Sequence, residues 1–297
     1  MRQYALWDGP QKIQPKVVNV AQIPQRSPFR YPGGKTWLVP HIREWLKGIS
    51  KKPRNFIEPF VGGGIVGLTV AFEDLADHVV IVELDKDVAA LWQTMLSDDN
   101  DWLAEKILDF DMTIETVRNE LACEPRDTKH RAFQTLLRNR TNHGGILAPG
   151  SGILKHGENG KGIRSRWYAE TLRKRIQNIK HVREKITFIQ GDGIEAIDNY
   201  AAQKTAVFFI DPPYTAGKNG KRAGTRLYTH NELDHERLFT RVEKVKGDFL
   251  MTYDNADEVV TLAARRGFMS RTISMMNTHH ATMQELIIGR DLSWVSS

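Results

Sequence analysis

One short stretch, residues 206–214, joins a buried strand to groups that can act on an amino group. It reads Ala-Val-Phe-Phe-Ile-Asp-Pro-Pro-Tyr, and its β-branched and aromatic residues predict a strand that the prolines end. Asp211, Pro212, Pro213 and Tyr214 then offer a carboxylate, carbonyls and a ring at the strand's carboxyl end, where open α/β sheets bind ligands. We predict an acceptor site for an amino group on a stacked planar base. The alternative is a plain Pro-rich turn.

Two glycine-rich segments precede this stretch. Phe-Arg-Tyr-Pro-Gly-Gly-Lys ends at Lys35, at the start of an expected helix, although such a turn needs no ligand. The expected strand 55–58 ends in Glu58 and leads through Pro-Phe-Val-Gly-Gly-Gly into an expected helix, 65–72, the first half of a nucleotide-binding unit. The spacing is not G-x-G-x-x-G and no Lys-Ser/Thr follows, which disfavours a nicotinamide dinucleotide and a Walker phosphate loop.

Acidic residues follow two further expected strands. Glu83 comes after the apolar run 79–82, about 20 residues past the glycines, where such folds bind ribose hydroxyls. Asp85 and Asp87 compete for that role, but we expect them to complement the dipole of the helix that follows. Asp192 follows the expected strand 186–189 and can face the same edge, near an adenine amino group.

The strand pattern lapses from residue 97 to residue 181, where four helices are expected, at 102–110, 114–121, 129–138 and 169–179. The intervening loops, 138–145 and a glycine-rich loop ending at 161–167, carry basic and amide side chains suited to phosphates and base edges. A second basic loop, 215–229, follows the Pro-Pro-Tyr stretch and can fold over a polyanion. The alternative for the inserted loops is a solvated surface. The candidate contacts to such a polyanion, which the resemblance described below implies to be DNA, are Arg138, Arg140, Asn142, His143, Arg164, Arg166, Lys221 and Arg222.

The remaining pattern completes an α/β chain. We expect helices at 233–245 and 258–265 and strands at 248–253, 272–276 and 285–289. The expected organisation is an N-terminal arm (1–26), a sheet domain (27–96 and 182–297) and an inserted, mainly helical domain (97–181); the resemblance described below implies that the sheet domain is catalytic and that the insertion recognises the target.

The composition of the chain indicates which classes of binding partner to expect. The 297 residues carry 42 Lys+Arg against 36 Asp+Glu, a net charge of +6, which favours a polyanion. The single cysteine, Cys123, excludes an internal disulfide, and the pair His279–His280 has no carboxylate cluster beside it, so we expect no metal. The chain shows no long apolar run and no signal sequence, so we expect no membrane contact and a soluble, cytoplasmic protein. We also expect a monomer, and the resemblance described next implies a location at the nucleoid or in a phage-infected cell.

The ordered motifs resemble those of the Dam-type DNA adenine-N6 methyltransferases. These motifs are FRYPGGK, IEPFVGGG, the acid after VVIV, QGD, DPPY and a final ELIIG, and the resemblance spans roughly residues 27 to 290. It implies a Rossmann-like, seven-stranded, S-adenosylmethionine-dependent methyltransferase sheet with a helical DNA-recognition insertion.

The resemblance also assigns site residues. Glu83 takes the ribose position, where the family commonly has Asp, so the charge is kept but the arm is longer. The Pro-Pro-Tyr motif supplies the catalytic residues Asp211, Pro212, Pro213 and Tyr214. The implied cofactor contacts are Tyr31, Lys35, Glu58, Phe60, Gly62, Gly64, Glu83, Asp192 and Asp211.

In such enzymes the target adenine is flipped out of the double-stranded DNA, and the methyl group is transferred by direct displacement without a covalent nucleophile or a metal. Tyr214 is expected to stack on the base, while Asp211 and the Pro212 carbonyl accept the amino hydrogens. Two other enzyme classes remain open, methylation of cytosine N4 and methylation of RNA; Asp at position 211 favours adenine. A catalytically silent DNA-binding protein is the third alternative.

Overall fold

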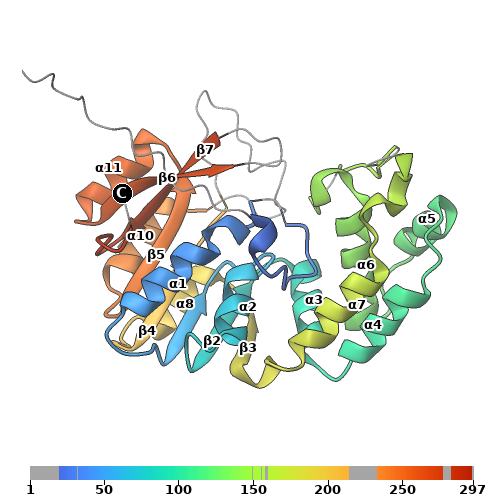
Figure 1. Cartoon of the computed structure of the whole chain (residues 1–297), viewed down its shortest axis with the longest axis horizontal. Helices are drawn as coiled ribbons and strands as arrows, with labels where there is room; N and C mark the ends of the chain where they lie inside the picture. Colours follow the sequence, from blue (N-terminus) through green and yellow to red (C-terminus); the bar gives the residue numbers. More distant parts are fainter. Residues whose placement is uncertain are drawn as a thin grey trace, which may run out of the picture.

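A seven-stranded sheet forms the centre of the molecule in the computed structural model (Figure 1). The structure describes residues 20–31, 33–148, 150–154, 156–157, 160–213, 233–276 and 282–295. The strands are β1 (Asn55–Glu58), β2 (His78–Glu83), β3 (Ile186–Gln190), β4 (Ala206–Ile210), β5 (Asp248–Asp254), β6 (Met269–Met276) and β7 (Thr282–Gly289). Their order is β3-β2-β1-β4-β5-β7-β6. The predicted fold class is confirmed.

The first five strands are parallel, and β7 runs antiparallel to both β5 and β6. Because the chain returns from β3 to the other side of β1, the strand order reverses between β1 and β4. Ligands of open α/β sheets bind outside the carboxyl ends of the strands at such a reversal. Glu58 and Glu83 end β1 and β2, and Asp211 directly follows β4, so the topology gathers these acids at one edge.

Helices cover both faces of the sheet, as the alternation of its side chains requires. Phe56 and Val207 face a core shared with α1 (Val39–Gly48), α2 (Ile65–Phe72) and α3 (Lys86–Leu96). Their neighbours Ile57 and Phe208 face the opposite core. That core is shared with α8 (Gly193–Tyr200), α10 (His235–Glu243) and α11 (Asp257–Arg265).

Four helices between β2 and β3 form a group beside the sheet, on the side of α3 (Figure 1). They are α4 (Asn100–Asp109), α5 (Ile114–Ala122), α6 (Thr128–Thr141) and α7 (Ala169–Ile179). α6 packs against α3, α4 packs against α7, and their apolar side chains continue the core that covers one face of the sheet. The inserted helices are therefore joined to the sheet through α3.

β6 and β7 begin three residues earlier than the strands expected at 272–276 and 285–289, and the end of α6 also differs from the prediction. We expected residues 138–145 to form a loop, but α6 continues to Thr141. Its last turn is stabilised from outside the helix, because Asn139 and Arg140 donate hydrogen bonds to the backbone of the segment before α1, at Arg30 and Pro28. A sequence pattern cannot show such a contact.

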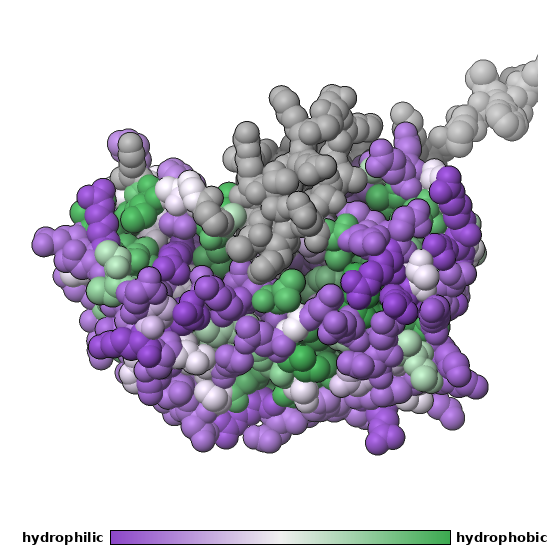
Figure 2. All heavy atoms as spheres, turned by 180° about the vertical axis from the view of Figure 1, so that it is seen from behind, coloured by the Kyte–Doolittle hydropathy of each residue, from purple (hydrophilic) through white to green (hydrophobic). Residues whose placement is uncertain are grey.

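Polar and charged side chains cover most of the face seen in Figure 2, with apolar side chains scattered among them. Among the described residues, no helix is long and apolar enough to cross a membrane.

Candidate active site

The loop between β1 and α2 is built from glycines in conformations that other residues avoid. Gly62 and Gly64 have φ values of +44° and +62°, and Gly64 is the N-cap of α2. The Trp92 indole lies where a side chain on Gly64 would have to go, and its Nε1 donates to the Gly62 carbonyl at 3.0 Å. Trp92, from α3, thus packs against the loop and stabilises its conformation.

Tyr31, at the end of the segment before α1, lies on the same loop. A Cβ atom added to Gly62 would come within 2.7 Å of the Tyr31 ring, and one on Gly63 within 2.9 Å of the Tyr31 Cβ. The Ser27 hydroxyl donates to the Gly63 carbonyl at 2.5 Å. Residues 27–31 therefore hold the loop. Tyr31 leaves no room for a side chain at Gly62 or Gly63, which explains the need for glycine there and could not be seen from the sequence.

Glu83 stands beside the loop at the end of β2. Its carboxylate accepts the Gly62 N–H at 3.1 Å and the Asp85 N–H at 2.9 Å. Burial raises the pKa of Glu83 to about 7, although these backbone hydrogen bonds favour the ionised form. The side chain is therefore placed at the glycine loop and changes charge near neutral pH.

The two aspartates that competed with Glu83 have structural partners. Asp85 caps α3 by accepting the N–H groups of Asp87 and Val88 at 2.8 and 3.1 Å. Asp87 forms an ion pair with Arg131 of α6 at 2.8 Å. Asp85 thus has the helix-capping role expected for it, and Asp87 ties α3 to the inserted helices.

Glu58 is buried, with 3% of its surface exposed, and accepts the Gly67 N–H of α2 at 2.8 Å. Burial raises the pKa of Glu58 well above its usual value, which favours a neutral carboxyl group. Gly67 has no room for a side chain, because a Cβ atom there would meet the Glu58 carboxylate. Glu58 thus joins the end of β1 to the first turns of α2.

Asp192 is the N-cap of α8 and accepts the Ile194 N–H at 2.7 Å. The next residue, Gly193, lies against the loop after β1. A side chain there would meet the Pro59 carbonyl and come within 2.9 Å of the Phe60 ring. The structure therefore brings Asp192 and Phe60 to the same edge as Glu83.

Asp211 is held by side chains from two other parts of the chain, Lys35 before α1 and Thr252 of β5. Its Oδ1 lies 3.0 Å from Lys35 Nζ and accepts the Thr252 hydroxyl of β5 at 2.7 Å. Lys35 Nζ also lies 3.0 Å from Glu285 Oε1 of β7 and donates to the Gly33 carbonyl at 2.8 Å. This cluster fixes the carboxylate at the carboxyl end of β4.

Two of the three charged side chains of this cluster are buried, and the third is partly exposed. Lys35 and Glu285 expose only 4% and 6% of their side chains, and Asp211 exposes 22%. Burial lowers the pKa of Lys35, but the ion pairs with Asp211 and Glu285 outweigh it, so its pKa lies above the usual value. Lys35 is therefore positively charged and forms ion pairs with two carboxylates at once.

Sequence reasoning missed Thr252 and Glu285 as members of this cluster. Thr252 is fully buried within an apolar strand, and threonine is ordinary in strands. Glu285 did carry a signal, because it begins the apolar run 285–289 that was expected to be a strand, and a charged residue in a buried strand needs a partner for that charge.

The predicted DNA contacts fall into different environments. His143 and Arg164 are exposed, Arg138 is half-buried beside Asp87, and Arg166 is half-buried beside the Asn142 carbonyl. Arg140 and Asn142 are buried, with 4% and 6% exposed. Tyr214, Lys221 and Arg222 lie outside the described residues, as does the pair His279–His280.

The fold and the site together are those of S-adenosylmethionine-dependent methyltransferases: a sheet of this strand order, a glycine loop after its first strand and an acid after its second. The chain belongs to the family of D12 class N6 adenine-specific DNA methyltransferases, whose family model matches residues 31–275. The family predicted from the motifs is confirmed. The chain is an adenine-specific DNA methyltransferase, which sets aside the cytosine, RNA and non-enzymatic alternatives.

Individual proteins are also similar to the chain. Type II methyltransferase M.MjaIII from Methanocaldococcus jannaschii is 26% identical over 234 residues, which cover 71% of this chain and 78% of the relative. A putative RNA methyltransferase from Pyrococcus horikoshii, PH1948, has a TM-score of 0.39 at 10% identity, over 94% of this chain and 92% of that one. The rRNA methyltransferase aviRa from Streptomyces viridochromogenes has a TM-score of 0.36 at 12% identity, over 84% and 82%.

The cofactor of this family is S-adenosylmethionine, and the residues present fit it. The loop from Gly62 to Gly64 offers backbone instead of side chains at the strand ends, and Glu83 places a carboxyl group beside it. No group of three or more His, Cys, Asp or Glu side chains is arranged to hold a metal ion within the described part of the chain.

Proposed function

We propose that the protein transfers a methyl group to the N6 amino group of adenine at a specific site in duplex DNA, by flipping the base out and by direct displacement. The observation that carries the proposal is the position of Asp211. Its carboxylate is fixed by Lys35 and Thr252 at the carboxyl end of β4, beside the reversal in strand order.

In this proposal Asp211 is a hydrogen-bond acceptor. The Asp211 carboxylate and the Pro212 carbonyl accept the two hydrogens of the adenine amino group. These bonds reduce the delocalisation of the nitrogen lone pair into the ring and direct it at the incoming methyl group. Pro212 and Pro213 have no N–H group, so the backbone beside the carboxylate offers no competing donor. Positioning and electrostatics supply most of the catalysis.

The cofactor residues act by holding and orienting. When bound, S-adenosylmethionine supplies an electrophilic methyl group on a positively charged sulfur. We assign the ribose hydroxyls to Glu83, the adenine end to Asp192 and Phe60, and support of the loop of Gly62 and Gly64 to Tyr31 and Glu58. Lys35 is assigned two roles: it orients Asp211, and it contacts the cofactor.

Base flipping is proposed because the amino nitrogen of a paired adenine is stacked within the duplex and cannot reach a recessed acceptor. Tyr214, the residue after Pro213, is assigned to stack on the extruded ring. The inserted helices are assigned to hold the duplex, with Arg138, His143, Arg164 and Arg166 toward it and with Lys221 and Arg222 from the loop after the site.

The test uses duplexes that carry 2-aminopurine, which fluoresces when unstacked, at the target adenine. Sequencing of DNA methylated by the purified protein first identifies the recognised site. We expect fluorescence to rise on binding at the target position, because the proposed contact with the single Tyr214 ring quenches less than the base stack on both faces, and to stay unchanged when the analogue occupies a neighbouring adenine. Efficient methylation of duplex DNA with no rise at the target position would contradict base flipping. Equal methylation of every adenine would contradict site specificity.

A further inference from the structure

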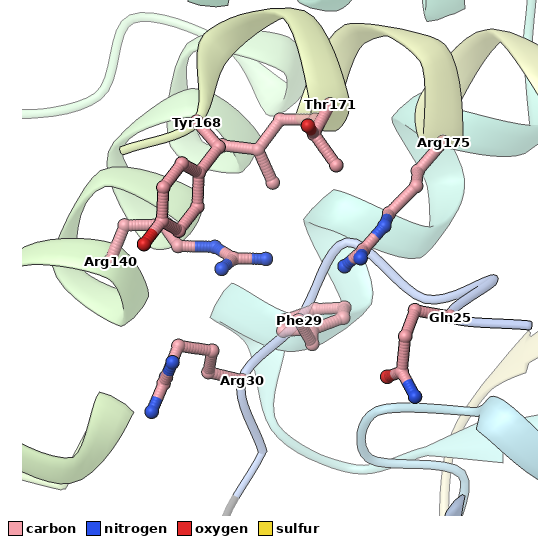
Figure 3. A pocket seen from close by; sticks show the side chains of 8 residues that line it. Gln25, Phe29, Arg30, Arg140, Tyr168, Thr171 and Arg175 are labelled. Atoms are coloured by element: carbon pink, nitrogen blue, oxygen red, sulfur yellow. The ribbon is translucent and has the colours of Figure 1, made fainter. Parts of the chain in front are cut away.

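A pocket of about 210 Å³ lies where the inserted helices meet the segment before α1. α6 contributes Arg140, and α7 with its N-cap contributes Tyr168 and Arg175; Arg30 comes from the segment (Figure 3). Arg140 and Arg175 extend toward one another across the pocket in that view, and Arg30 lies at its rim. The other lining residues are Gln25, Phe29, Thr171 and Leu172.

The pocket concentrates positive charge. Three of its eight described lining residues are arginines, and none of the eight is acidic. Arg140 exposes only 4% of its surface. Burial lowers the pKa of Arg140 to about 9, and the charges of Arg175, Arg30 and Arg166 act in the same direction. A bound anion would offset this repulsion.

The hydrogen bonds of Arg140 point to the same ligand class. One of its terminal nitrogens, Nη2, donates to the Pro28 carbonyl. Its Nε is buried and has no acceptor among the described residues. A guanidinium group has five N–H donors in a planar fork that matches phosphate oxygens. Arg175 donates to the Ser27 carbonyl at 3.1 Å, which uses one of its five donors.

We propose that this pocket binds one phosphodiester group of the DNA backbone, with Arg140 and Arg175 donating to its oxygens and with Arg30 and Tyr168 at its rim. The inference rests on the proposal that the substrate is duplex DNA. A backbone phosphate carries no sequence information, so the contact fixes the register of the duplex on the protein.

The position of the pocket gives this contact a route to the active site. Residues 27–31 lie between the pocket and the glycine loop. Their backbone accepts from Arg140 and Arg175 on one side, and Ser27 and Tyr31 contact Gly63 on the other. A phosphate held by the arginines is therefore placed relative to the cofactor loop through a single short segment.

The experiment compares Arg175→Gln with Lys204→Gln, a matched loss of one charge. Lys204 is exposed in the turn before β4, at the edge of the sheet opposite the active site. Affinity is measured by fluorescence anisotropy for duplexes in which one phosphate at a time is replaced by an uncharged methylphosphonate. For the wild type we expect one position that costs on the order of tenfold in affinity.

In the Arg175→Gln protein, affinity for the unmodified duplex should fall on the order of tenfold. Replacing the phosphate at the sensitive position by methylphosphonate should then lower the affinity little further, because the contact is already lost. The slope of log affinity against log salt should flatten by about 0.9, the contribution of one phosphate contact. Lys204→Gln should keep both the wild-type slope and the wild-type sensitivity to the methylphosphonate. Arg30→Gln keeps the backbone hydrogen bonds of residue 30 with Asn139; it should repeat the pattern more weakly and guards against misfolding of the first variant.

A methylphosphonate profile identical in wild type and both pocket variants would overturn the proposal. If inorganic phosphate then protects the wild type, but not Arg175→Gln, against urea at constant ionic strength, the pocket holds a free anion instead of DNA. These measurements require no methyl transfer, so a failure here is separate from a failure of the proposed reaction.

Discussion

The proposed acceptor residue, Asp211, is short and partly exposed, so its orientation comes from its neighbours. Both the Lys35 ammonium and the Thr252 hydroxyl contact the same oxygen, Oδ1. Lys35 is in turn held by Glu285 and by the Gly33 carbonyl. Such a network restricts the carboxylate before the substrate arrives, and preorganised groups of this kind avoid reorganisation during the reaction.

A second residue, Glu83, gives a prediction about pH. We expect its ionisation to make the affinity for S-adenosylmethionine depend on pH. Burial raises the pKa of Glu83 to about 7, and only the ionised carboxylate can accept both ribose hydroxyls. Affinity for S-adenosylmethionine should therefore rise as the pH increases through 7 and then level off. Glu83→Gln should bind more weakly, with affinity nearly constant between about pH 6 and 8, as measured by titration calorimetry.

The same group affects stability with a definite sign. Because the pKa of Glu83 is about 7 in the folded chain and 4.5 ordinarily, the folded state binds the proton more tightly. The contribution of Glu83 to the free energy of unfolding should thus be greatest below pH 4.5 and fall as the pH rises to 7. For the cofactor-binding prediction, a wild-type affinity for S-adenosylmethionine that does not change as the pH passes through 7 would contradict the role assigned to Glu83.

Among the structural elements, the segment 27–31 joins the inserted helices to the sheet. Asn139 of α6 is fully buried and binds both sides of one residue: it accepts the Arg30 N–H at 2.8 Å and donates to the Arg30 carbonyl at 3.0 Å. It also donates to the Gly145 carbonyl at 2.8 Å. The side chain thus ties the segment, α6 and the loop after α6 together.

We predict that Asn139→Ala lowers the free energy of unfolding by about 2–4 kcal/mol, because it leaves the backbone groups of Arg30 and Gly145 without these partners. It should also weaken cofactor binding, since the segment holds the glycine loop. Urea denaturation and calorimetry check the two effects. Asn178→Ala, at an exposed position of α7, is the control and should change neither. A loss of stability below about 0.5 kcal/mol would show that Asn139 does not hold this junction.

Elements with strong local signals were predictable from the sequence. β1, β4, α2 and α7 occupy the predicted ranges, since apolar runs and glycine or proline boundaries mark them. α8 was not predicted, although Asp192 stands at its N-cap position. The end of α6 was placed too early, because Arg-Asn-Arg-Thr resembles a loop until Asn139 and Arg140 meet the segment near Arg30.

In the molecule as a whole, the strand order explains why the acids at the strand ends could be placed at one edge from the sequence, whereas their contacts could not be predicted. Acids after successive parallel strands must meet at one edge, so Glu83, Asp192 and Asp211 were identifiable. The ion pairs of Lys35 with Asp211 and Glu285 join residues far apart in the chain. No local pattern encodes such a pairing.

The inserted helices and the sheet act as one unit in this arrangement. Their apolar side chains form a common core through α3, and the arginine pocket lies at their junction. In the proposed complex, DNA bound by the insertion is held in a fixed relation to the glycine loop and to Asp211. The proposed direct displacement requires this, because the reacting atoms must be aligned closely.

The most direct test of this account is single-turnover methyl transfer by Asp211→Ala at saturating DNA and cofactor. We predict that the rate of N6-methyladenine formation falls by at least about 10²–10³-fold while affinity for duplex DNA is unchanged, because the lost group acts on the amino nitrogen and not on the duplex. Asp198→Ala, at an exposed position of α8, should retain the wild-type rate. An Asp211→Ala protein that binds DNA and methylates adenine at close to the wild-type rate would contradict the account.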